Sequence, residues 1–455
     1  MRLGWSDLQR LSDDGAEEIE IDGFVHPVGW ADSHSYFVLG PEEPCCLGCL
    51  PRDPRRAIEV FARIPVAPGG RVRLAGRLHR LRGDAAGFRF QMRDARPVGL
   101  GRRALLAAGP LMCFAVGAGA ASAVETDSAR AALEDAATVD MHSHAGRITG
   151  VRTVTTGSVA FKAVAEPMRG GNMAAACLAV VSDGPTHRVD ADHRIRPFRE
   201  PDPGELYAFG TRSFERLHML IAQQGLRVIQ TAADLRAARG HAPGVIVSAE
   251  GADFLEGRIE RVEQARTRWQ LRHLQLTHYR VNELGDIQTE APVHGGLTDF
   301  GAEVIRHCNA SGIVVDIAHG TFELVKRAAD VTTKPLILSH TSLSERPAQR
   351  SRLISPEHAR LVAETGGVIG IWPPKSRFPT MAALAQGFAA MVDVVGVDHV
   401  GLGSDMLGLT GPAIYADYDD TPALAAALLA QGFHADEMRK LLGGNYVRVF
   451  GASLG

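Results

Sequence analysis

The sequence predicts a mixed α/β protein in which a (β/α)₈ TIM-like barrel follows a small all-β domain and an apolar segment. Three observations support this division into residues 1–100, 101–125 and 126–455. The first hundred residues hold short runs of period two, separated by glycine and proline. Residues 104–124 contain no charged side chain. From about residue 136 onward, eight short apolar runs alternate with segments of helical character, which is typical of βα units around a parallel sheet.

The composition is that of a globular protein and offers no electrostatic reason to bind nucleic acid. The 455 residues include 49 Lys+Arg and 52 Asp+Glu, and 45% of them are hydrophobic. Small or neutral partners are therefore expected. Six cysteines are too few for a disulfide framework. Cys45, Cys46 and Cys49 form a cluster that is either a metal or redox site or an ordinary loop. The loop is favoured, because a structural zinc site needs four ligands.

In the first segment, the runs "EIEIDGFV", "RVRLAGRL" and "GFRFQM" alternate apolar and polar residues between turn residues. Such patterning predicts a small antiparallel barrel or sandwich, and an OB-like barrel is one such form. The pattern names no ligand. The role of residues 1–100 therefore stays open.

The second segment has the parts of an export signal at an unusual position. Arg102 and Arg103 precede the uncharged stretch and "ASA" closes it, as in a twin-arginine signal. As a helix, the stretch is long enough to span a bilayer of about 30 Å. Three interpretations stay open: an internal signal anchor, a start codon assigned too far upstream, and an Ala/Gly-rich linker helix. Export or anchoring is favoured, which predicts membrane association through residues 104–124 and a periplasmic or outward-facing location. A cytoplasmic location is the alternative.

The third segment supplies the eight barrel strands. They are "TVDMHSH", "AACLAVV", "GVIVSAE", "HLQLTHY", "GIVVDIAH", "PLILSHT", "GVIGIW" and "HVGLGSD". Stretches such as "GAEVIRHCNAS" and "SPEHARLVAET" between them have helical character. Eight successive units predict a closed barrel, whose active site lies at the C-terminal ends of the strands.

Imidazoles and carboxylates stand at those strand ends. They are His142 and His144, Glu250, His278, His319, His340 and Asp405, from the first, third, fourth, fifth, sixth and eighth strands. Strand alternation directs residues i and i+2 to the same side, so His142 and His144 can both face the barrel axis. His273, His294, His307 and His399 occupy no strand end and are expected at the surface.

These residue types suit Zn²⁺, which binds neutral imidazole and carboxylate. The set offers more donors than one tetrahedral ion requires. It therefore favours two zinc ions per chain, bridged by Glu250 and a hydroxide.

Longer motifs resemble those of a known family. The segments "VSAEG", "LTHYRVNELGD", "GLTDFGAEVIRHCNASGIVVDIAH", "PLILSHTS", "RLISPEHARLVAETGGVIGI", "HVGLGSD" and "GGNYVRVF" are similar to those of the membrane (renal-type) dipeptidases, peptidase family M19 of the amidohydrolase superfamily. The resemblance runs from about residue 136 to 451 and leaves residues 1–125 uncovered. It implies a metal-dependent hydrolase barrel that cleaves dipeptides, including those with a D-residue at the C-terminal position.

The resemblance also implies roles for single residues. His142 matches the first metal-binding histidine and Glu250 the bridging glutamate, while His319 and His340 match the pair on the second ion. His278 matches a histidine that reaches the substrate near the scissile carbonyl. Arg352, in "SRLISPEH", falls where the family binds the substrate's terminal carboxylate. Asp405 matches the acid that passes a proton to the leaving amine.

Two departures from the family pattern bear on the substrate. His144 stands where the family usually has aspartate, and His-x-His is the form common in other amidohydrolases. "DMLG" replaces "DFDG" after Asp405, and Trp372 ends the seventh strand where tyrosine is typical. Two alternatives to a dipeptidase therefore stay open: an N-acyl-amino-acid hydrolase or lactonase, and a non-catalytic envelope binding protein. A homodimer is also expected.

Overall fold

A computed structural model of the chain describes residues 2–5, 7–8, 17–27, 34–42, 54–66, 71–81, 89–98, 129–134, 136–146, 161–190 and 194–454. These residues fall into two compact units, Met1–Gly117 and Ala118–Gly455. The signal-like segment 101–125 and the cluster of Cys45, Cys46 and Cys49 lie outside the described residues. Within the described ranges, no helix is long and apolar enough to cross a membrane.

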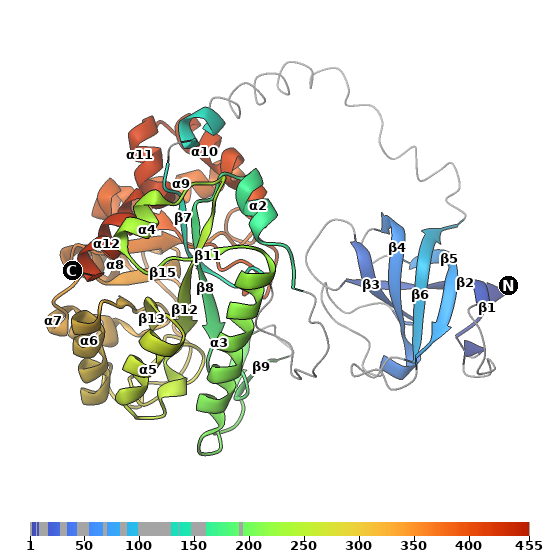
Figure 1. Cartoon of the computed structure of the whole chain (residues 1–455), viewed down its shortest axis with the longest axis horizontal. Coiled ribbons are helices and arrows are strands. Elements are labelled where there is room, and N and C mark those ends of the chain that lie inside the picture. Colours follow the sequence, from blue (N-terminus) through green and yellow to red (C-terminus); the bar gives the residue numbers. More distant parts are fainter. Residues whose placement is uncertain are drawn as a thin grey trace. The chain divides into compact units, whose positions relative to one another are not determined.

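The N-terminal unit is an all-β barrel (Figure 1). Its strands are β1 (Arg2–Leu3), β2 (Glu17–Pro27), β3 (His34–Gly40), β4 (Ile58–Val66), β5 (Arg71–Arg80) and β6 (Phe90–Pro97). They pair in the order β1-β2-β3-β4-β6-β5, and an additional pairing of β2 with β5 closes the sheet. Apart from the parallel pairs β1–β2 and β4–β6, the ladders are antiparallel. This closed sheet is the barrel form of the two all-β forms, barrel and sandwich, that the period-two runs predicted.

The core of this unit follows from that alternation. Ile19 and Ile21 are fully buried, whereas Glu20 between them is partly exposed. Because side chains of a strand point alternately to opposite faces, a period of two fills the inside of a barrel and leaves polar residues outside.

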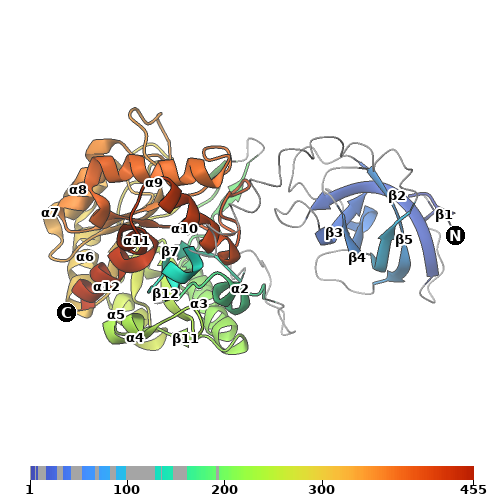
Figure 2. The ribbon, with the colours of Figure 1, turned by 90° about the horizontal axis from the view of Figure 1, so that it is seen from above.

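The C-terminal unit is a closed parallel barrel of eight strands (Figures 1 and 2). The strands are β7 (Val139–Ser143), β8 (Ala175–Val181), β12 (Gly244–Glu250), β13 (His273–Gln275), β14 (Val314–Asp316), β15 (Ile337–Thr341), β16 (Val368–Ile371) and β17 (Val400–Leu402). Each pairs with the next, and β8 pairs with β12 along seven residues of each strand. The short β11 (Arg227–Val228) adds to β12 outside the ring. All eight predicted strands are confirmed.

Helices surround the barrel strands (Figure 2). They are α2 (Ala165–Gly170), α3 (Glu205–Gln223), α4 (Ala232–Ala237), α5 (Glu260–Arg268), α6 (Asp299–Ser311), α7 (Phe322–Val331), α8 (Pro356–Glu364), α9 (Met381–Val395), α10 (Thr421–Ala430), α11 (Ala435–Arg439) and α12 (Asn445–Leu454). A hydroxyl at the N-cap begins several of them: Thr298, Thr321 and Ser355 accept from backbone N–H groups of the first turn. Short apolar strands and capped helices therefore alternate, and the parallel strands bring all their C-terminal ends to one face of the barrel.

One histidine lies elsewhere than the sequence suggested. His273 was expected at the surface, but it is fully buried at the start of β13. Its Nε2 lies 3.1 Å from Oδ2 of Asp316 and its Nδ1 lies 2.9 Å from the hydroxyl of Tyr446. The prediction was wrong because both ring nitrogens find partners inside the protein, which removes the cost of burying an imidazole.

Candidate active site

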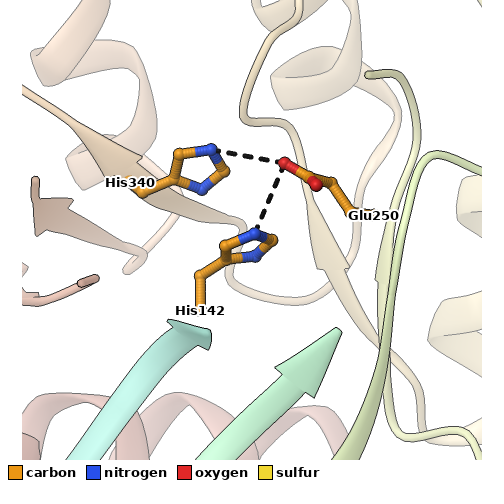
Figure 3. A group of neighbouring side chains, drawn as sticks. All are labelled: His142, Glu250 and His340. Carbon is orange, nitrogen blue, oxygen red and sulfur yellow. Dashed lines mark ion pairs between the residues drawn. The ribbon is translucent and has the colours of Figure 1, made fainter. Parts of the chain in front are cut away.

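The seven strand-end residues converge in one buried cluster at the C-terminal ends of the barrel strands. Glu250 ends β12 and lies at its centre. Its Oε1 lies 3.4 Å from Nε2 of His142, 3.2 Å from Nε2 of His319 and 3.5 Å from Nε2 of His340. Its Oε2 lies 3.1 Å from Nε2 of His144 and 3.1 Å from Nε2 of His278. Each carboxylate oxygen therefore faces its own group of imidazoles. Figure 3 shows His142 and His340 directed at the same oxygen.

The two histidines of β7 face the cluster together, as strand alternation predicted. Their Nε2 atoms lie 3.2 Å apart. Nδ1 of His144 lies 3.1 Å from the carbonyl oxygen of Ala179 and can only donate to it, which directs Nε2 toward Glu250. Burial lowers the pKa of His144, but the Glu250 carboxylate outweighs this effect and raises that pKa to about 9.

His319 and His340 form a second pair, with their Nε2 atoms 3.1 Å apart. Burial lowers the pKa of both imidazoles well below the usual value, so both are neutral at physiological pH. His319 has a φ of 69°, a left-handed conformation that is rare outside glycine. Such backbone strain persists where the surrounding structure holds a side chain in a required direction.

This donor set fits divalent metal ions. Nitrogen atoms at 3.1 and 3.2 Å from one another repel if both present lone pairs, unless a proton or a cation lies between them. Among the described residues, four groups of three have their donor atoms within 4.8 Å of one another: His142, Glu250 and His340; His142, His144 and Asp405; Asp183, His187 and His278; and Glu250, His278 and His319. Imidazoles that share a carboxylate in a closed pocket are the ligands that zinc and related ions take.

His278 is held by an aspartate that the sequence reasoning missed. Its Nδ1 lies 2.7 Å from Oδ1 of Asp183, and the other oxygen of Asp183 accepts from the backbone N–H of Tyr279 at 3.0 Å. Nδ1 of His187 lies 3.2 Å from the same Oδ1. Burial raises the pKa of Asp183, but the charges of His278 and His187 hold it well below its usual range. The carboxylate is therefore ionised and accepts from Nδ1–H of His278, which directs Nε2 of this ring toward Glu250.

Asp405 joins the cluster from the segment after β17. Its Oδ1 lies 3.5 Å from Nε2 of His144, and its backbone N–H donates to the carbonyl oxygen of His142 at 2.9 Å. Its φ of 48° is also in the left-handed region. Burial raises the pKa of this carboxyl to about 7. A carboxyl group whose pKa lies near neutral pH, and which lies beside a candidate metal-binding cluster, is suited to accept and return a proton.

Arg352 lies beside the cluster rather than in it. Its Nη1 donates to Oε1 of Gln288 at 2.8 Å, and its Nη2 to the carbonyl oxygen of His340 at 3.4 Å. It lines a cavity of about 580 Å³ together with Tyr279, Trp372 and Asp405. A cavity of this size holds a small ligand.

Asp140 is a second carboxylate that the sequence did not indicate, and it supports the cluster through hydrogen bonds to neighbouring segments. Asp140 is fully buried on β7 and accepts from the backbone N–H of Ser404 at 2.9 Å and from the Tyr418 hydroxyl at 3.1 Å. It therefore ties β7 to the segment that carries Asp405. The motif "DMHSH" contained a usable signal, because Asp140, His142 and His144 are spaced to share one face of the strand. Asp183 gave no such signal, because its partner His278 lies 95 residues away along the chain.

Comparison with known sequences places the barrel among peptidases. The sequence model described as "Membrane dipeptidase (Peptidase family M19)" matches residues 209–453. Dipeptidase aclJ of Aspergillus oryzae is 30% identical over 222 residues, which cover 46% of this chain and 52% of that protein. Dipeptidase 3 of Mus musculus is 29% identical over 161 residues, or 34% of this chain and 32% of the mouse protein. The chain thus spans about half the length of the Aspergillus protein and 32% of the length of the mouse protein.

Solved structures share the fold. An amidohydrolase from Pseudomonas aeruginosa superposes with a TM-score of 0.58 at 20% identity, covering 72% of this chain and 99% of that one. A metallo peptidase from Rhodobacter sphaeroides, liganded with a phosphinate mimic of the dipeptide L-Ala-D-Ala, gives 0.55 at 21% identity and covers 70% and 99%. At these identities the likeness is one of fold.

Proposed function

Because the chain belongs to the membrane dipeptidase family, peptidase family M19, we propose that it is a metal-dependent hydrolase of dipeptides that carries two zinc ions. The observation that carries the proposal is the placement of Glu250 between two pairs of imidazoles. The Nε2 atoms of His142 and His144 lie 3.2 Å apart, those of His319 and His340 lie 3.1 Å apart, and all four contact the Glu250 carboxylate. A bidentate carboxylate in this position suits a bridge between two ions. His142 and His144 would hold one ion with Glu250, and His319 and His340 the other.

Bound zinc would supply a nucleophilic hydroxide near neutral pH and polarise the scissile carbonyl. Side chains of the protein would stabilise the developing charge, transfer the proton and bind the substrate. His278, oriented by Asp183, directs Nε2 into the cluster, and with protons on both ring nitrogens it would donate from Nε2 to the oxygen that gains charge during attack. Asp405 would take the proton from the nucleophile and give it to the departing nitrogen. Arg352 would hold the substrate's C-terminal carboxylate through its planar guanidinium.

A second candidate is another amidohydrolase activity, on N-acyl amino acids or lactones. His144 favours it, since this imidazole takes the place of a carboxylate usual in the family and makes the site less negative by one charge. A free amino group on the substrate would then meet one carboxylate fewer. The metal-binding cluster and the proton-shuttle position of Asp405 serve either reaction equally.

A substrate screen with and without chelator tests the proposal. Purified protein should contain about two zinc ions per chain and hydrolyse dipeptides, including those with a C-terminal D-residue. Chelation should abolish hydrolysis, and added zinc should restore it. Glu250→Gln keeps the size of the side chain but removes its charge, so this variant should hold less zinc and show no activity. Hydrolysis of N-acyl amino acids or lactones but not dipeptides would select the second candidate. Protein without metal and without activity would leave the non-catalytic alternative.

A further inference from the structure

Arginines from separate loops line the cavity beside the candidate metal centre. Arg350 and Arg352 lie on the loop after β15, and Arg377 lies on the loop after β16. Arg194, between β9 (His187–Val189) and β10 (Ile195–Pro197), lines the same cavity and donates to the carbonyl oxygen of Arg350 at 2.6 Å. Among the described residues that line the cavity, Asp405 is the only carboxylate. The lining therefore carries a clear excess of positive charge.

The hydrogen-bond acceptors that Arg352 and Arg377 contact are uncharged, so these contacts do not neutralise the two guanidinium groups. Arg377 donates to the carbonyl oxygen of Leu343, and Arg352 donates to Gln288 and to a backbone carbonyl. In the part of the chain that the structure describes, Arg350, Arg352 and Arg377 form no ion pair with a carboxylate, and the lining carboxylate Asp405 contacts His144 instead. A guanidinium has five N–H donors and stays charged at any physiological pH. Donors and charge thus remain for an anionic ligand.

We propose that the cavity selects dipeptides whose C-terminal residue carries a second acidic group, that is, an aspartyl or glutamyl side chain. This selectivity rests on the proposed dipeptidase activity, in which Arg352 holds the α-carboxylate. The side chain of the C-terminal residue leaves the same carbon atom as that carboxylate, so it lies beside Arg352. There it meets the part of the lining that Arg350 and Arg377 form.

Size and charge agree with this assignment. The cavity of about 580 Å³ leaves room for a side chain beyond the dipeptide backbone. A carboxylate in it would receive charge-assisted hydrogen bonds, which are roughly twice as strong as neutral ones. A lysyl or arginyl side chain at the same position would be repelled, and a neutral one would gain no such bond.

The test compares two substrates that differ in charge but hardly in shape, Ala-Glu and Ala-Gln, with either L or D stereochemistry at the second residue. The zinc-loaded enzyme should have a kcat/KM at least about fivefold higher for Ala-Glu, and the ratio should fall as salt screens the arginines. Ala-Lys should be the poorest of the three substrates. A ratio near one at low salt would overturn the inference.

Variants locate the source of the preference. Arg350→Gln and Arg377→Gln should each reduce the ratio of Ala-Glu to Ala-Gln, and the double variant should bring it close to one. Arg346→Gln is the matched control, because Arg346 is an exposed arginine of the same loop that does not line the cavity. The ratio in this control should equal that of the wild type. An unchanged ratio in the double variant would contradict the assignment.

Equilibrium binding separates this inference from the proposed function. If no dipeptide is hydrolysed, the proposed function fails, and calorimetric titration with free glutamate and free glutamine then decides the inference. Tighter binding of glutamate that is lost in the double variant supports an acidic-ligand cavity. Equal binding of the two amino acids overturns it.

Discussion

At the scale of single residues, the site depends on how Glu250 and its neighbours share atoms. One carboxylate faces five imidazoles, and its two oxygens divide them into two groups. Burial raises the pKa of Glu250, but the surrounding imidazoles hold it well below its usual range. The centre of the site is therefore an ionised carboxylate surrounded by the Nε2 atoms of five imidazoles. The paired nitrogen atoms lie 3.1 and 3.2 Å apart and would repel each other without a proton or a cation between them.

The role of Asp183 in orienting His278 can be tested by a single substitution. Asp183→Asn keeps the size of the side chain but removes the charge that fixes Nδ1 of His278 as a donor. Residues that orient a functional imidazole in this way typically contribute a factor of about 10 to 100 in activity or metal affinity. We expect kcat on a dipeptide substrate to fall within that range, while KM and zinc content change little. Steady-state kinetics and metal analysis measure these quantities.

Asp190→Asn is the control for this substitution. Asp190 is a partly exposed aspartate near the same hairpin, where it pairs with Arg188 and Arg196. Exposed ion pairs contribute little, so this variant should retain nearly full activity. Full activity of Asp183→Asn would show that His278 needs no partner at Nδ1.

At the scale of elements, close packing of neighbouring strands positions the imidazoles. A Cβ atom placed on Gly370 of β16 would lie 1.7 Å from the carbonyl oxygen of Ser339 on β15. One placed on Gly403, after β17, would lie equally close to the same oxygen. Ser339 directly precedes His340 and its hydroxyl contacts Nδ1 of His340 at 2.9 Å. Glycine at these two positions therefore sets how closely β15 and its neighbours approach, and with it the place of His340.

Gly370→Ala tests this packing. The added methyl group overlaps backbone atoms that cannot move without spreading the strands. We expect the free energy of unfolding to fall by about 1–3 kcal/mol, or soluble protein to be lost. Gly411→Ala is the matched control, because a Cβ there meets no atom within 4 Å. Its effect should stay within about 0.5 kcal/mol. Denaturant titration of both variants gives the comparison, and equal stability would contradict the packing argument.

At the scale of the whole molecule, the chain contains two units with separate cores. Buried residues of β2 to β6 form the core of the N-terminal unit, whereas the barrel of the C-terminal unit has its own clusters. The candidate metal ligands all belong to the barrel. Metal binding should therefore stabilise one unit and leave the other unaffected.

Calorimetry of the full chain with and without chelator tests this separation. An ion bound at a concentration 1,000 times its Kd stabilises the folded state by about 4 kcal/mol. We expect removal of zinc to lower the Tm of the barrel transition by about 5 °C or more. The transition of the N-terminal unit should not move. In Glu250→Gln the chelator should have little effect. If the chelator does not change the Tm of the barrel transition in the wild-type chain, this result would argue against bound zinc.

The sequence by itself determined the fold class and the identity of the cluster. Short apolar runs alternating with helical segments encode a parallel barrel, because only buried strands covered by helices have that pattern. His142, Glu250 and His340 could be named in advance, since a barrel brings its C-terminal strand ends together. The role of residues 1–100 was not readable, because alternation specifies a barrel but no ligand.

Only the tertiary structure decided the contacts that orient the cluster. Asp183 meets His278 across 95 residues of sequence, and Asp140 meets Ser404 across 264. Arg350 and Arg377 line one cavity although they belong to different loops. The burial of His273 likewise depended on Asp316 and Tyr446. Periodicity reports which face of an element is buried, but a pairing between distant side chains depends on the packing of the whole barrel. That packing exists only once the chain has folded.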